Sequence, residues 1–192
     1  MSRWQNSIHK LSSTTEHKDR ELEDFFKPKN YQPVTDEEIQ IFDEFSLIVS
    51  SMAILIYVAN ADKTIDQAEK EQIVNDMLFQ MEQRPYEFSK LSKKFGDNEK
   101  EVILNIYDKL YAEYQTNKLN LDKILEEIYL LYQNNPEKRY YLIRLCFFSA
   151  MSDNVFDEAE KRAIHNIALS MDVATEELDR IEMEVKQELQ KK

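Results

Sequence analysis

Hydrophobic residues recur along the chain at intervals of three and four, which is the spacing of helices that bury one face. Four such stripes are present, running from Ile73 to Met81, from Val102 to Tyr114, from Leu121 to Leu131 and from Leu178 to Val185. The apolar segment FSLIVSSMAILIYVANA, from Phe45 to Ala61, is the longest stretch of the chain without a charged residue. The pattern predicts an all-α fold of about seven to nine helices.

Several sequence signals mark where these helices begin. Thr35 opens the sequence TDEE, a capping box, and predicts a long helix that ends near Asn60. Asp66 is predicted to open the next helix, and the segment Pro85–Phe95 to form another. Asn135 before a proline predicts a further start, and the last helix is expected to begin near Thr175.

Residues 1–34 are polar and irregular and differ from the remainder of the chain. Trp4, Ile8 and Leu11 share one face of a short segment that is too short to form a stable helix alone. We therefore expect residues 1–34 to form a flexible or partner-binding arm that packs weakly on the core. Residues 35–192 are expected to form a single helical domain.

Composition excludes several classes of protein. One glycine and four prolines leave little material for the turns of a β protein. A net charge of −12 repels nucleic acids and anionic lipids and leaves cations or basic proteins as natural partners. Cys146 is expected to be a buried hydrophobic residue, and the start MSRWQNSIHK lacks a secretory signal, so we expect a cytoplasmic protein. Three serines and an asparagine interrupt Phe45–Ala61, which favours a helix enclosed by other helices over a transmembrane span.

An acidic phrase occurs twice. ANADKTIDQAEKEQI, residues 59–73, aligns without a gap with AMSDNVFDEAEKRAI, residues 150–164, and the shared pattern is A-x-x-D-x-x-x-D-x-A-E-K-x-x-I. The repeat is too widely spaced for a solenoid. It predicts an internal duplication, in which each lobe contains a hydrophobic helix, an acidic turn and an amphipathic helix.

The repeated acids allow two interpretations. Asp66 with Glu69, and Asp157 with Glu160, fit the D-x-x-E start of a helix, where the acids cap backbone amides and complement the helix dipole. Capping does not explain the acid four residues upstream in each copy. The alternative is a site for a divalent cation such as calcium or magnesium, with six candidate ligands: Asp62, Asp66, Glu69, Asp153, Asp157 and Glu160.

The two phrases, together with the tail MDVATEEL, resemble the TerB family of tellurite-resistance and stress proteins, whose fold also occurs in the middle region of the co-chaperone DjlA. The resemblance implies an all-helical, duplicated fold with a metal site on an acidic surface. It places the family's Asp-Gly turn on Asp62-Lys63 and Asp153-Asn154, where both glycines are missing. Because lysine tolerates a left-handed conformation poorly, we expect the first copy to be the one that has lost metal binding.

Catalytic signals are weak. The three histidines, including His165, show no metal or triad spacing, and one glycine cannot form a phosphate loop, so we expect no enzyme activity. Tyr107, Tyr111 and Tyr114 recur at helical spacing and are expected in the core.

Two functional hypotheses remain from the sequence. The first is a TerB-like metal-binding or metal-responsive scaffold in tellurite, envelope-stress or defence responses, with protein partners and peripheral to the cytoplasmic face of the inner membrane. The second is an acidic inhibitor-like or immunity-like protein that binds a basic partner and uses the acidic phrases only as helix caps.

Overall fold

The computed structural model of the chain describes Leu22 and residues 35–82, 98–152 and 156–191, and within these residues the fold is all-helical. The described part contains seven helices and no strand: α3 (Asp36–Ala59), α4 (Gln67–Glu82), α6 (Glu99–Gln115), α7 (Leu121–Tyr132), α8 (Pro136–Ala150), α9 (Glu158–Ser170) and α10 (Thr175–Leu189). The predicted all-α class is therefore confirmed. Most of residues 1–34, the predicted helix Pro85–Phe95, and Asp153 with Asn154 lie outside the described residues.

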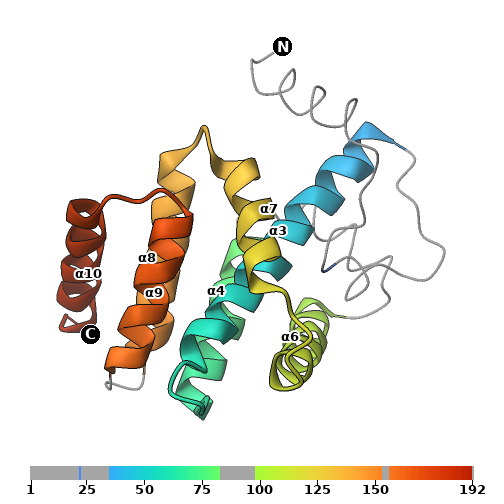
Figure 1. The fold of residues 1–192 in the computed structure, drawn as a ribbon. Helices are drawn as coiled ribbons and strands as arrows, with labels where there is room; N and C mark the ends of the chain where they lie inside the picture. The colour runs from blue at the N-terminus through green and yellow to red at the C-terminus, as the bar shows by residue number, and fades with distance from the viewer. Residues whose placement is uncertain (1–21, 23–34, 83–97, 153–155, 192) are drawn as a thin grey trace.

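Helix α3 is the centre of the bundle. It packs against α4, α6, α7, α8 and α9, whereas α10 packs against α8 at one edge (Figure 1). Nearly every described side chain from Phe45 to Asn60 is buried, because other helices cover α3 on several sides. The prediction of a helix enclosed by helices is thus confirmed. Among the described residues, no helix has the length and apolar character required to cross a membrane.

Local sequence signals account for helix α8. The side chain of Asn135 accepts a hydrogen bond from the Lys138 amide, and Pro136 occupies the first helical turn, where its missing N–H costs nothing. Behind this start, none of residues 142–150 is exposed, and Cys146 and Phe147 are buried with most of their neighbours in α8. Burial raises the pKa of the Cys146 thiol, which agrees with its predicted role as a core residue.

The core also includes a residue from the predicted arm. Leu22 is only 1% exposed and belongs to the same hydrophobic cluster as Phe45 and Val49 of α3. At this position, therefore, the segment before α3 contributes to the packed interior. Trp4, Ile8 and Leu11 lie outside the part of the chain that the structure describes, so the weak packing expected of the arm stays a prediction.

Candidate functional site at the first acidic turn

The first acidic phrase forms a reciprocal cap at the start of α4. One carboxylate oxygen of Asp66 accepts a hydrogen bond from the Glu69 amide at 2.8 Å, and the Glu69 carboxylate accepts from the Asp66 amide, also at 2.8 Å. Two backbone amides that lack partners within the helix are satisfied in this way. Glu69 is buried as a result, and the capping interpretation is confirmed for this copy.

The second acidic phrase repeats the arrangement at α9. Oδ1 of Asp157 accepts from the amides of Ala159 and Glu160 at 2.7 and 2.8 Å, and the Glu160 carboxylate accepts from the Asp157 amide at 3.0 Å. Glu160 is buried, as Glu69 is in the first copy. The repeated sequence thus produces the same hydrogen-bond pattern twice. Whether the two helix pairs superpose as lobes of a duplication stays a prediction.

The turn before α4 has the backbone conformation that its resemblance to an Asp-Gly turn implied. Lys63 has a φ of 79°, in the left-handed region that favours glycine. The carboxylate of Asp62 accepts hydrogen bonds from the Thr64 amide at 2.8 Å and from the Thr64 hydroxyl. These bonds stabilise the turn in this conformation, although the left-handed region disfavours a residue with a side chain such as Lys63.

Replacing Lys63 with glycine is therefore expected to raise the free energy of unfolding by about 0.5–1 kcal/mol, because glycine adopts the left-handed conformation without a steric penalty. Urea denaturation of the two proteins measures the difference. The matched control is Lys109→Gly on the exposed face of α6, which is expected to cost about 1 kcal/mol. A loss of stability in Lys63→Gly similar to that of the control would show that the turn does not strain Lys63.

The described residues do not gather a metal-binding cluster. Within residues 35–82, 98–152 and 156–191, no three Asp, Glu, His or Cys side chains lie close enough to hold a metal ion. In the first copy, Asp62 is bonded to Thr64, while Asp66 and Glu69 bond each other's amides. Asp153 lies outside the described residues, so the second set of predicted ligands is not fully placed and metal binding there stays a prediction.

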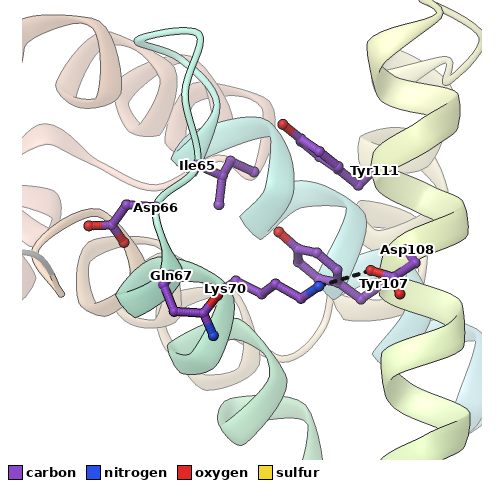
Figure 2. A pocket seen from close by; sticks show the side chains of 7 residues that line it. All are labelled: Ile65, Asp66, Gln67, Lys70, Tyr107, Asp108 and Tyr111. Atoms are coloured by element: carbon purple, nitrogen blue, oxygen red, sulfur yellow. Dashed lines mark hydrogen bonds and ion pairs between the residues drawn. The ribbon is translucent and has the colours of Figure 1, made fainter.

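A pocket of about 120 Å³ lies beside the first cap, between the start of α4 and the side of α6. Figure 2 shows its lining: Ile65, Asp66, Gln67, Lys70, Tyr107, Asp108 and Tyr111. Lys70 crosses the pocket floor, with its Nζ 3.0 Å from Oδ1 of Asp108 and 4.9 Å from the centroid of the Tyr107 ring. The lysine therefore joins the repeated acidic phrase to α6.

The two tyrosines of the pocket stack on each other. Their ring centroids are 6.1 Å apart and the ring planes differ by 19°. Tyr107 is only 2% exposed and Tyr111 is half-buried against the core, as the helical spacing predicted. Burial, and then the charges of Tyr111, Asp108 and Glu69, raise the pKa of Tyr107, so its hydroxyl remains protonated at neutral pH.

Sequence reasoning missed this pocket as a site. Lys70 belongs to the repeated phrase but was assigned no role, and Asp108 was not singled out. The signal in the sequence that could have found the pocket is the spacing of Tyr107 and Tyr111 on one predicted helix, with Asp108 between them. His165 is half-exposed on α9 and does not line the pocket.

Comparison with known proteins identifies the family. The family profile of TerB, described as "Tellurite resistance protein TerB", matches residues 49–183. A search of curated proteins and a search of solved structures each returned no match. The matched segment begins in α3, ends in α10 and includes both capping boxes and the pocket. Because it spans most of the chain, this protein belongs to the TerB family.

Proposed function

We propose that this chain is a non-enzymatic TerB-family module that binds a basic protein partner through its acidic surface. The observation that carries the proposal is the pair of capping boxes. They give Asp66, Glu69, Asp157 and Glu160 a structural use that requires no cation. These four acids therefore need no metal to explain them, and the net charge of −12, which includes them, can attract a basic partner.

The edge helix α10 supports a protein-binding role. It packs on α8 and leaves its other side uncovered by the described helices (Figure 1). Glu176, Asp179 and Met183 are exposed there, which places acidic groups around an apolar side chain. Such a mixture is typical of surfaces that bind proteins, where an apolar contact lies within a charged rim.

The test is binding of the full chain to a polybasic peptide of alternating lysine, arginine and serine, measured by fluorescence anisotropy at increasing salt. We expect binding that weakens steeply with salt, because exposed charges are screened over about 10 Å at 0.1 M. Reversing Glu176 and Asp179 to lysine is expected to weaken it further. An acidic peptide of equal length is the control. Equal binding of the two peptides, or no binding of either, would contradict the proposal.

Divalent cation binding at the second acidic turn is the second candidate function. It is favoured by the geometry of Asp157, which caps α9 through Oδ1 alone, so Oδ2 makes no hydrogen bond within the described residues. Asp153, four residues earlier in the sequence, would supply a second carboxylate. Oxygen ligands of this kind suit calcium or magnesium.

Melting temperature with calcium, magnesium, manganese or zinc tests this candidate. A cation that binds only the folded protein stabilises it by about 2.7 kcal/mol at a hundredfold excess over Kd. Asp153→Asn should abolish the effect, and Asp62→Asn in the first copy should not. No thermal shift with any of the four ions would remove the candidate.

We further propose that the module acts in tellurite or envelope-stress resistance, in a peripheral complex at the cytoplasmic membrane face. The family description, which names tellurite resistance, supports the resistance part of this proposal. Growth on tellurite of cells lacking the gene, compared with cells that carry it, tests the role. Equal growth would contradict it.

A further inference from the structure

We propose that the pocket between α4 and α6 binds the guanidinium group of an arginine on the partner. The inference rests on the proposed function, because it names the group by which a basic partner is recognised. It depends on three features of the pocket: the sign of its charge, its free hydrogen-bond acceptors and its tyrosine rings.

The charge of the pocket favours a cation. Asp66 and Asp108 both line it, and the single lysine, Lys70, is already paired with Asp108 at 3.0 Å. The start of a helix normally attracts anions, but here the cap residues Asp66 and Glu69 already complement the dipole of α4. Figure 2 shows the Asp66 carboxylate pointing away from the tyrosine rings, so an anionic ligand beside the rings would meet the Asp108 carboxylate and an overall charge of −12.

The pocket also contains acceptors without partners. Tyr107 is 2% exposed, yet its hydroxyl makes no hydrogen bond to any residue that the structure describes. Figure 2 shows that this hydroxyl points into the space between α4 and α6. The hydroxyl therefore opens onto the pocket, where a ligand that donates a hydrogen bond can replace water as its partner. Asp108 accepts from Lys70 through Oδ1, which leaves its Oδ2 available for the same ligand.

The aromatic lining favours arginine over lysine. A guanidinium group is planar, stacks on aromatic faces and carries five N–H donors in a rigid fork, whereas an ammonium group is compact and strongly hydrated. Tyr111 is half-buried and stacks on Tyr107, and both rings line the pocket. Because Lys70 already lies against the Tyr107 ring, a guanidinium group at this position would contact the Tyr111 ring and donate to an acceptor of the pocket. The volume of about 120 Å³ suits the end of one side chain.

The test is an NMR titration of the isotopically labelled full chain with the pentapeptide amide Gly-Ser-Arg-Ser-Gly. Matched peptides carry lysine, or citrulline, which has nearly the shape of arginine without its charge. We expect the arginine peptide to shift the signals of Lys70, Tyr107 and Tyr111 and to bind about fivefold more tightly than the lysine peptide. The citrulline peptide should cause no shift at these residues.

Three variants separate the pocket from general electrostatics. Asp108→Asn is expected to weaken binding of the arginine peptide about tenfold, because it removes a direct charge-assisted contact. Asp179→Asn removes the same charge from exposed α10 and should change the affinity less than about twofold. Tyr107→Phe keeps the buried ring and should weaken binding without lowering the melting temperature, an outcome that a purely structural role for the hydroxyl would not produce.

The outcomes distinguish this inference from the proposed function. If the polybasic peptide binds but the arginine peptide causes no shift at the pocket, the pocket assignment is wrong and the acidic-surface proposal stands. Equal effects of Asp108→Asn and Asp179→Asn, or equal affinity for arginine and lysine peptides, also overturn it. Shifts of the same residues by inorganic phosphate would show an anion site instead. Failure of all basic peptides would overturn both proposals.

Discussion

Replacing Phe147 with alanine is expected to lower the free energy of unfolding by about 3–5 kcal/mol, because the truncation leaves a cavity in the packed core. Phe147 is 1% exposed and lies on α8, which packs against α3, α4, α7, α9 and α10. Its ring also contacts Phe156 edge to face, at a centroid distance of 5.9 Å. Urea denaturation of the variant and the parent measures the loss.

Phe79→Ala is the matched control for this substitution. Phe79 lies on α4 and is 54% exposed, so the same change of side chain is expected to alter stability by no more than about 0.5 kcal/mol. The difference between the two losses of stability measures the effect of burying the phenylalanine ring. Similar losses in the two variants would contradict the placement of Phe147 in the packed core.

Removing both helix caps has the second largest expected effect. The double variant Asp66→Ala, Asp157→Ala should lose about 2 kcal/mol, because each cap contributes about 1 kcal/mol and each opens a different helix. Each single variant should therefore lose about half of the total. Urea denaturation of the parent, the single variants and the double variant measures these values.

The control keeps the caps and removes the charges. Asparagine caps helices about as well as aspartate, so the double variant Asp66→Asn, Asp157→Asn should retain most of the stability. A loss in the asparagine variant as large as that in the alanine variant would show that charge, rather than capping, stabilises these turns.

Much of the fold could be predicted because its signals are local. The Asn135-Pro136 start of α8 follows from a few neighbouring residues, and helical periodicity identified the buried stripes, whereas α10 begins at Thr175 without a side-chain cap. The capping boxes were predictable for the same reason. Lys63 was placed in a left-handed turn because the resemblance aligned it with a glycine, and its φ of 79° agrees.

The remainder depends on contacts between residues distant in the sequence. The ion pair of Lys70 with Asp108 joins positions 38 residues apart and exists because α4 packs on α6. Arg139 of α8 donates to the carbonyl of Met171 at 2.7 Å, across 32 residues, and thereby supports the end of α9. No local pattern specifies either contact, so neither the pocket nor this support could be read from periodicity or caps alone.

Calcium dependence of stability tests most directly the central claim that the acidic phrases are helix caps on a protein-binding module. The measurement is the free energy of unfolding of the parent, Asp157→Ala and Asp157→Asn, each with and without millimolar calcium. We predict that calcium changes none of the three values, that Asp157→Ala costs about 1 kcal/mol in both conditions, and that Asp157→Asn costs little. Stabilisation of the parent that rises with calcium concentration and disappears in Asp157→Asn would contradict the claim.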